Sequence, residues 1–187
     1  MKIGITSDTH GDISSWQLMM DKYFSDADLI IHCGDILYHG PRNPLPTSYN
    51  PAELATAINN SPVPVLIAAG NCDADVDQLA LDVPIQSPYL LIQYQNRRLL
   101  ANHGHMLTRE AIYEQIARYS IDIFIFGHSH VPELEKSAKS ILLNPGSPAL
   151  SKFQCNNEVV YTAASLADEE IKIFDIYTGR NIYHIPL

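Results

Sequence analysis

The sequence predicts an α/β protein built on buried parallel strands. Short hydrophobic runs recur along its first two thirds, and segments with helix-like patterning alternate with them. In addition, every one of these runs is followed closely by Asp, Asn or His. Because open α/β sheets hold ligands at the carboxyl ends of their strands, we expect these polar residues to meet at one rim of the sheet.

The predicted strands and helices follow one another in order. The strands cover residues 3–5, 29–31, 63–69, 99–101 and 121–126, which are runs short enough for buried strands. The helices cover residues 13–24, 51–60 and 108–119, and each has Ser, Thr or Pro near its start. This alternation predicts one half of the molecule.

A second sheet is predicted from two strand-like regions, residues 89–102 and residues 141–187. The later region includes the segments VVYTA, EIKIFDIY and NIYHI. The pairs Gln95-Asn96 and Thr178-Gly179 are typical of hairpin turns. We expect this second sheet to pack against the first.

Seven residues at the strand exits are candidate metal ligands: Asp8 and His10 in SDTH, Asp35 in CGDI, Asn71 in GNCD, His103 in NHGH, and His128 and His130 in GHSH. They suit a pair of cations. One cation would take Asp8, His10 and His130, and the other would take Asn71, His103 and His128. Asp35 has two carboxylate oxygens and would bridge the pair.

Oxygen and imidazole ligands without an obligatory thiolate favour borderline divalent ions. We expect two Mn²⁺ ions, with Zn²⁺, Fe²⁺, Ni²⁺ or Co²⁺ as alternatives. Two such ions bind a phosphoryl oxygen and generate hydroxide near neutral pH. The sequence therefore predicts hydrolysis of small phosphodiesters by attack of a hydroxide that bridges the metals.

The motif order D-x-H, G-D, G-N-x-D, H-G-H, G-H-x-H resembles the calcineurin-like metallophosphoesterase superfamily over residues 3–147. Three segments resemble its small bacterial and archaeal phosphodiesterase branch: GNCD, HGPRN at 39–43 and NPGS at 144–147. The resemblance implies a four-layer αββα sandwich with two mixed β-sheets and a dinuclear Mn²⁺-type centre at its rim. For NPGS, a structural turn is preferred over a direct role in the site.

Cys72 departs from the pattern, because many members of this superfamily have a histidine there as a proton donor to the leaving group. A thiol with an ordinary pKa of about 8.5 is a poor substitute, so substrates with poor leaving groups should suffer most. Replacement donors are His39 and His105, and Arg42 is a candidate phosphate clamp. Alternatively, HGPRN is only a surface loop ordered by its proline.

Besides the metal ligands, the sequence predicts a catalytic set, which includes two of those ligands, and a substrate-binding set. Asp73 would, by the resemblance, orient its neighbours, although it could instead cap the helix that follows it. The predicted catalytic set is Asp35, Asn71, Cys72, Asp73 and His105, and the predicted substrate-binding residues are His39 and Arg42. Three residues are expected to be structural: His32 in a strand, Cys33 in the core, and His184 at the surface or in packing.

Length and composition favour a single domain, residues 1–187, that is soluble and cytoplasmic. Its 21 acidic and 12 basic residues give a net charge of −9 without a basic stripe, which argues against long nucleic acids as partners. The three cysteines have no paired spacing, and export is not expected because no apolar signal core precedes the strand KIGITSD. No apolar run approaches the length that a membrane span needs. By the resemblance we expect a homodimer or homotetramer.

Two other functions stay open. A phosphomonoesterase or nucleotide phosphatase would need a more cationic pocket, for which Arg42 is the obvious contributor. A non-catalytic protein-binding scaffold also uses this fold in a retromer subunit, but there the metal ligands have been lost, whereas here all seven are present.

Overall fold

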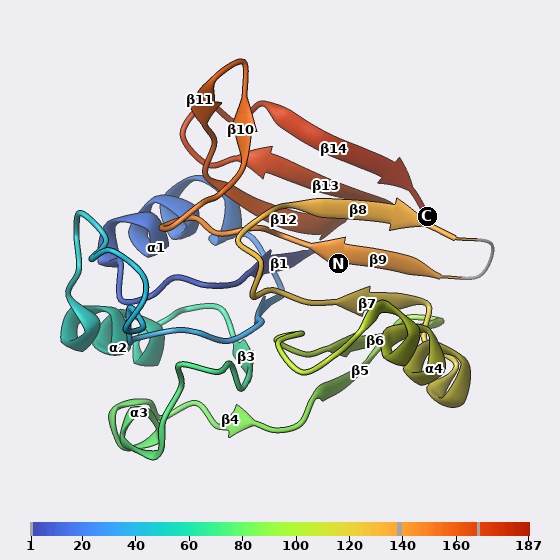
Figure 1. Cartoon of the computed structure of the whole chain (residues 1–187), viewed down its shortest axis with the longest axis horizontal. Coiled ribbons are helices and arrows are strands. Elements are labelled where there is room, and N and C mark those ends of the chain that lie inside the picture. Colours follow the sequence, from blue (N-terminus) through green and yellow to red (C-terminus); the bar gives the residue numbers. More distant parts are fainter. Residues whose placement is uncertain (1, 138–139, 168) are drawn as a thin grey trace.

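The computed structural model describes residues 2–137, 140–167 and 169–187, and its described strands form two large mixed sheets and a small hairpin (Figure 1). The larger sheet has seven strands in the order β14-β13-β12-β1-β2-β3-β4. These strands are β1 (Ile3–Thr6), β2 (Leu29–His32), β3 (Val65–Ala68), β4 (Ile85–Gln86), β12 (Thr162–Ala167), β13 (Glu170–Asp175) and β14 (Asn181–Pro186).

The smaller sheet has five strands in the order β5-β6-β7-β9-β8. Its strands are β5 (Leu90–Tyr94), β6 (Arg97–Ala101), β7 (Ile123–Ile125), β8 (Glu133–Lys136) and β9 (Ile141–Asn144). Strands β10 (Gln154–Cys155) and β11 (Glu158–Val159) form the separate hairpin. The predicted hairpin turns at Gln95-Asn96 and Thr178-Gly179 are confirmed, since they join β5 to β6 and β13 to β14.

The predicted division of strands between the two sheets is wrong in part. The carboxyl-terminal strands join the first sheet, because β12 pairs antiparallel with β1. Conversely, β7 was expected beside β1 to β3, yet it belongs to the second sheet, where it pairs in parallel with β6 and β9. The strands β5, β6 and β9 do lie in the second sheet, as residues 89–102 and the start of the region 141–187 predicted. Hydrophobic patterning marks a strand as buried on both faces but does not say which neighbour it will pair with.

The helices cover the outer faces of the sheets. They are α1 (Ile13–Met19), which continues into the π-helical turn η1 (Met20–Phe24), α2 (Pro51–Asn59), α3 (Asp75–Ala80) and α4 (Arg109–Tyr119). The three predicted helices are confirmed, and the side chains of Asp12, Asn50 and Thr108 cap the amino termini of α1, α2 and α4. The short α3 was not predicted. Within the described ranges, no helix is both long and apolar enough to span a bilayer.

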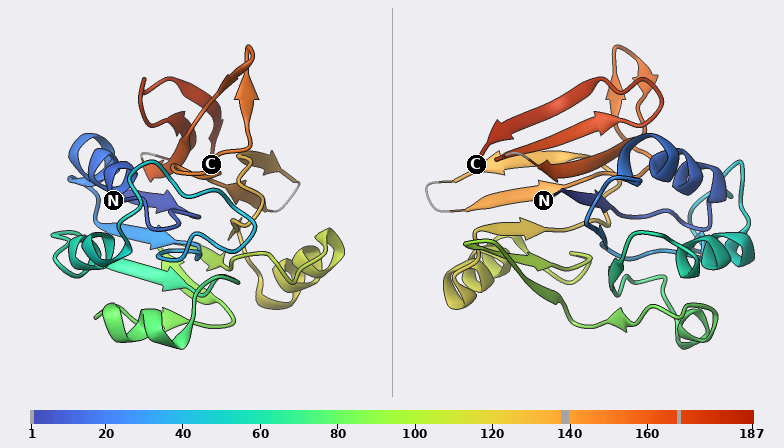
Figure 2. Two further views of the ribbon diagram at one scale, coloured as in Figure 1. Left: turned by 60° about the vertical axis from the view of Figure 1, so that its left-hand side comes forward. Right: turned by 180° about the vertical axis from the view of Figure 1, so that it is seen from behind.

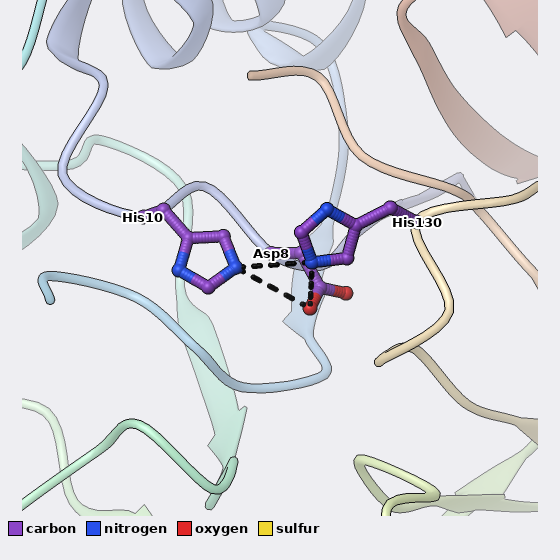
Figure 3. Close-up of side chains that lie close together, drawn as sticks. All are labelled: Asp8, His10 and His130. Carbon is purple, nitrogen blue, oxygen red and sulfur yellow. Dashed lines mark hydrogen bonds and ion pairs between the residues drawn. The ribbon is translucent and has the colours of Figure 1, made fainter. Parts of the chain in front are cut away.

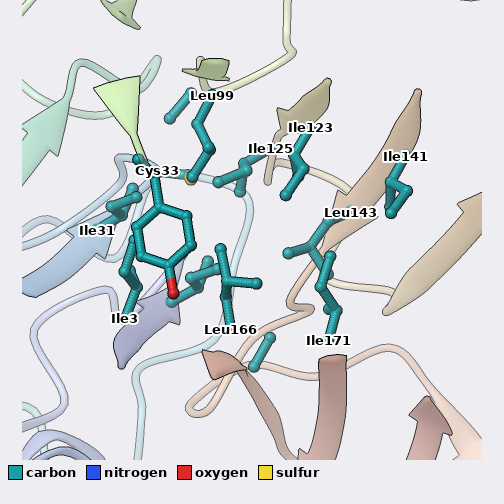
Figure 4. Close-up of a cluster of buried hydrophobic side chains, with 14 of the residues drawn as sticks. Ile3, Ile31, Cys33, Leu99, Ile123, Ile125, Ile141, Leu143, Leu166 and Ile171 are labelled. Atoms are coloured by element: carbon teal, nitrogen blue, oxygen red, sulfur yellow. The ribbon is translucent and has the colours of Figure 1, made fainter. Parts of the chain in front are cut away.

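Three hydrophobic cores separate four layers. Figures 1 and 2 show these layers from three sides. Alternate residues of one strand face different cores: Ile123 and Ile125 lie between the sheets, while Phe124 packs towards α4 (Figure 4). Residues such as Ile30 and Ile67 pack under α1 and α2. The four-layer αββα sandwich is therefore confirmed, and the exits of β1, β2, β3, β6 and β7 lie near one another at one edge.

Candidate metal centre and active-site cleft

Most of the predicted ligands, which follow the ends of the strands, have a left-handed backbone conformation. Five of the seven have positive φ angles, namely Asp8 (57°), His10 (47°), Asp35 (57°), His128 (69°) and His130 (60°). Residues with side chains rarely adopt this conformation, and when they do the surrounding structure must hold them there. Such a concentration at the strand exits is typical of a functional site.

Three histidines are fixed so that the same nitrogen faces the site. The Nδ1 atoms of His10, His103 and His130 lie 2.8, 2.7 and 2.6 Å from the carbonyl oxygens of Tyr38, Cys33 and Leu150. A carbonyl only accepts hydrogen bonds, so each Nδ1 carries the proton. Each Nε2 is left to bind a cation, an arrangement common around metal-binding histidines.

The first group consists of Asp8, His10 and His130, whose side chains are buried and converge in Figure 3. Asp8 Oδ1 is 3.2 Å from His130 Nε2 and 3.7 Å from His10 Nε2. The two Nε2 atoms are only 3.1 Å apart. Because both Nδ1 atoms hold protons, two lone pairs face each other and the buried Asp8 Oδ1 has no hydrogen-bond partner. Such an arrangement calls for a positive charge between these atoms.

The second group centres on Asp35 and His103. Asp35 Oδ2 lies 3.4 Å from His103 Nε2 and 3.8 Å from His10 Nε2, so this one oxygen faces a histidine of each predicted cation site. His103 Nε2 is also 3.1 Å from Asn71 Oδ1. Asp8 Oδ1 is 3.9 Å from His103 Nε2, so Asp8 also lies between the two groups. The geometry supports the predicted bridging position of Asp35.

His128 lies at the exposed side of this second group. Its imidazole packs edge-on against that of His103, with ring centroids 5.2 Å apart, and its backbone N–H donates to Asp8 Oδ2. Asn71 is exposed as well, whereas Asp8, His10 and His130 are buried. One half of the centre is therefore enclosed, and the other half opens to solvent, as a site that admits a substrate must.

The pKa values of the buried groups are shifted because carboxylates and imidazoles lie close together away from water. Burial alone would raise the pKa of Asp8, but its interactions with His10 and His130 hold that pKa far below its ordinary range. Burial lowers the pKa of His103, yet the hydrogen bond with Asp35 and the charges of Asp8 and Asp35 outweigh it and raise the pKa to about 9. The pocket thus stabilises positive charge strongly.

These donors fit two divalent cations. They supply carboxylate oxygens, an amide oxygen and imidazole nitrogens whose second nitrogen is already bonded, which are the ligands of borderline divalent ions. The unpartnered Asp8 Oδ1 and the facing lone pairs of His10 and His130 are satisfied when a cation lies between them. Asp35 would then contribute to both cation positions.

Two further segments hold the ligand loops in place. The Asp73 carboxylate accepts hydrogen bonds from the backbone N–H groups of Gly70, Asp35 and Ile36. It does not cap α3, whose N-cap is Ala74. The NPGS turn acts similarly, because Asn144 donates to Gly127 O and Ser147 donates to Asp8 O. Both segments therefore orient the ligands that precede or follow them.

A cleft of about 850 Å³ lies over the open side of the centre. Asp35, Asn71, Cys72, Asp73, His128 and His130 contribute to its walls. Arg42 lines it as predicted, and Lys152 lines it as well. Lys152 was missed because it belongs to no motif, although it lies only five residues beyond the NPGS turn. With two cationic side chains, the cleft is more basic than the sequence suggested.

The other predicted residues take different positions. His39 is not among the residues that line the cleft, since its ring packs against those of Tyr38 and Tyr49. His105 is exposed beside the centre, with its ring 5.4 Å from that of His103 and 6.1 Å from that of His128. Cys72 lines the cleft, and its backbone N–H donates to Asp35 Oδ1 at 2.7 Å. Burial and the charge of Asp35 raise the pKa of the Cys72 thiol to about 12.

The residues expected to be structural are located accordingly. His32 ends β2 fully buried, and its Nε2 lies 2.9 Å from Thr9 Oγ1. Cys33 belongs to the core between the sheets (Figure 4). His184 is exposed on β14, 3.6 Å from a carboxylate oxygen of Glu170.

The fold and the candidate centre place the chain in one class of proteins. These are α/β proteins of two sheets with a cation site, rich in aspartate and histidine, where the strands end. The family model for the calcineurin-like phosphoesterase superfamily domain matches residues 1–166. The chain belongs to this superfamily.

Individual proteins similar to this chain carry names from the same superfamily. Phosphodiesterase YfcE of Escherichia coli K12 is 35% identical over 153 residues, which are 81% of this chain and 82% of that protein. A probable metallophosphoesterase of Bacillus subtilis, YsnB, is 28% identical over 82% of this chain and 79% of its own length. The solved structure of the phosphoesterase YfcE from E. coli superposes with a TM-score of 0.87 at 27% identity, covering 100% and 99% of the two chains. Zinc-bound Vps29 of Entamoeba histolytica shares the fold, with a TM-score of 0.66 at 18% identity over 100% and 99% of the chains.

Proposed function

We propose that the protein is a metal-dependent phosphodiesterase that hydrolyses small phosphodiesters at a dinuclear centre. The observation that carries this proposal is the buried Asp8 Oδ1, which lacks a hydrogen-bond partner and faces the Nε2 atoms of three histidines. The relative named a phosphodiesterase, YfcE, supports the substrate class. Two divalent cations at such a centre supply Lewis acidity and a nucleophile from water near neutral pH.

The residues of the chain divide the work. Asp8, His10 and His130 would hold one cation, Asn71, His103 and His128 the other, and Asp35 both. The Cys72 N–H holds Asp35 Oδ1, so that Oδ2 faces the histidines. Arg42 and Lys152 supply positive charge in the cleft for a phosphoryl oxygen or a second anionic group.

The chain has no strong proton donor at the position where many relatives have a histidine. The Cys72 thiol has a pKa of about 12, so it gives up a proton poorly near neutrality. The His105 ring lies beside the ligand histidines His103 and His128, whereas His39 does not line the cleft, so we propose His105 as the candidate donor. We therefore propose that activated diesters, whose alcohols leave without a proton, are the better substrates.

A second candidate function is phosphomonoester hydrolysis, which Lys152 favours. A monoester carries more negative charge than a diester, and Lys152 adds a second cation to the cleft beside Arg42. The testing experiment compares bis-p-nitrophenyl phosphate with p-nitrophenyl phosphate across Mn²⁺, Zn²⁺, Fe²⁺, Co²⁺ and Ni²⁺, with a chelated control. Faster turnover of the diester, dependent on metal, supports the proposal, and preference for the monoester supports the alternative.

A non-catalytic scaffold is the third possibility, since Vps29 proteins share the fold. The same assay decides it, because a scaffold shows no metal-dependent turnover of either substrate. Mn²⁺ as the native ion, a homodimer or homotetramer, and a cytoplasmic location stay predictions of the sequence. They are tested by metal analysis, by light scattering and by cell fractionation.

A further inference from the structure

A second cavity opens beside the cleft, between α2, α3 and the loop before α2. It has a volume of about 320 Å³, and its walls are largely carbon, with Leu37, Tyr38, Tyr49, Pro51, Ala52 and Val76 among them. Asp77 is the one charged residue among the described side chains that line it, and its carboxylate already accepts a hydrogen bond from Ala74 N. The α2 and α3 helices, which supply part of this wall, lie one above the other in Figure 1. We call this cavity the apolar pocket.

The apolar pocket adjoins the cleft over the metal centre. Tyr38, Cys72 and Ala74 line both cavities. Cys72 reaches the centre itself, because ligand atoms of Cys72, His10 and Asp35 all lie within 4.8 Å of one another. An esterifying group of a phosphodiester held at the predicted ligands would therefore lie close to the apolar pocket.

The walls of the apolar pocket are built rigidly and are tied to the metal ligands. The carbonyl of Tyr38 fixes His10, while its ring forms part of the wall. His39 packs edge-on against both Tyr38 and Tyr49, with ring centroids at 4.7 and 5.3 Å. Gly11 admits the Tyr49 ring, because a Cβ there would lie 2.5 Å from Tyr49 Cε2. A pocket held this way is formed before its ligand arrives.

The two cavities differ in chemistry. Arg42 and Lys152 line the cleft, and neither lines the apolar pocket. The larger cavity therefore suits the phosphoryl group and any polar or anionic arm of a substrate. The smaller one, at the low end of the volumes of small-molecule pockets, suits a single ring or a short alkyl group.

We propose that the apolar pocket is a specificity subsite that binds an apolar, ring-sized esterifying group of the phosphodiester substrate. This inference rests on the proposed phosphodiesterase function and adds the substrate class to it: diesters with one aromatic or compact aliphatic alcohol. Removal of that group from water provides binding energy that a diester of two small polar alcohols lacks.

The test uses two anions without a scissile ester bond, diphenylphosphinate and dimethylphosphinate, which share the charged phosphoryl group. Their affinities for the Mn²⁺-loaded full chain are measured by calorimetry. Diphenylphosphinate should bind about tenfold more tightly, as expected when roughly 60 Å² of ring surface leaves water. Ala52→Phe, which fills the apolar pocket from α2, should abolish this preference and leave dimethylphosphinate binding unchanged.

Thr56→Phe is the matched control, since it adds the same ring one turn further along α2 at an exposed position outside the apolar pocket. It should keep the preference. Ala80→Phe fills the apolar pocket from α3 and replaces Ala52→Phe if that variant does not fold. Equal binding of both phosphinates by the unmodified protein, or a preference that survives both filling variants, would overturn the subsite. If neither phosphinate binds and bis-p-nitrophenyl phosphate is not hydrolysed, the proposed function is wrong and the subsite with it.

Discussion

At the scale of single residues, the centre depends on how each polar atom is partnered. Asp35 shows this division within one carboxylate, because Oδ1 accepts the Cys72 N–H while Oδ2 faces His10 and His103. Asp8 divides its oxygens similarly: Oδ2 accepts the His128 N–H and Oδ1 has no hydrogen bond. In both cases the protein fixes one oxygen and leaves the other for a cation.

Asp35→Asn should therefore cost far more activity than Cys72→Ser. The amide removes the negative charge that serves both cation positions, whereas serine keeps the backbone N–H that holds Asp35. We expect a loss of about 100-fold or more for Asp35→Asn, and less than about tenfold for Cys72→Ser. The check is the Mn²⁺-supplemented rate with bis-p-nitrophenyl phosphate, together with metal content. Comparable losses in the two variants would count against the bridging position.

At the scale of elements, the strand exits were predictable and the pairing of strands was not. A hydrophobic run that ends in Asp or His identifies a strand and its functional end, and this logic located the ligands after β1, β2, β3, β6 and β7. It did not reveal that β12 pairs with β1, although the two strands lie near opposite ends of the sequence. The elements α3, β4 and β8 escaped prediction because their patterns are weak: α3 has six residues, β4 has two, and β8 reads ELEK.

The Asp73 carboxylate joins the loop after β2 to the loop after β3 through three hydrogen bonds. We therefore expect Asp73 to stabilise the loops that carry Asp35 and Asn71. In Asp73→Asn, one carboxylate oxygen becomes an NH2 group that cannot accept, so at least one of the three backbone N–H groups loses its acceptor and faces a donor: that of Ile36 if Oδ1 is replaced, or those of Asp35 and Gly70 if Oδ2 is replaced. The expected loss is about 2–4 kcal/mol in the free energy of unfolding. Urea unfolding measures it, with Asp75→Asn, an exposed neighbour at the start of α3, as the control. If the two variants have the same stability, Asp73 does not organise these loops.

His32 at the end of β2 should make the fold sensitive to acid. Thr9 Oγ1 donates to Ile36 O, so it accepts from His32 Nε2–H, and His32 Nδ1 accepts from Gly34 N–H. Burial lowers the His32 pKa to about 3, far below the value of about 6.5 in an unfolded chain. The unfolded state therefore binds the extra proton first, and stability is present above pH 6.5 and is lost as the pH falls towards 3.

The measurement is urea unfolding at pH 7 and pH 5 for the unmodified protein and for His32→Gln. His32 should contribute a loss of about 2 kcal/mol between these pH values, and the variant should lack that part of the loss even though it is less stable at pH 7. An identical pH dependence in both proteins would show that His32 is not held in its neutral form.

At the scale of the whole molecule, the centre lies where the two sheets meet. Asp8, His10, Asp35 and Asn71 follow strands of the seven-stranded sheet, whereas His103, His128 and His130 follow strands of the five-stranded sheet. The predicted convergence of scattered ligands is thus a property of the sandwich rather than of one sheet. Cations bound there would connect the two sheets at the edge of the core that lies between them (Figure 4).

The cations should therefore stabilise the entire fold. A ligand at 100 times its dissociation constant stabilises the native state by about 2.7 kcal/mol, which in a chain of this size raises the Tm by roughly 5–10 °C. Thermal unfolding with Mn²⁺ and with chelator measures this shift, and it should shrink at pH 5, where protons compete for the ligand imidazoles. His130→Ala removes a ligand from one sheet and should lose most of the shift, whereas His184→Ala, on the exposed face of β14, should keep it. An undiminished shift in His130→Ala would mean that the stabilising ion binds elsewhere and does not tie the sheets together.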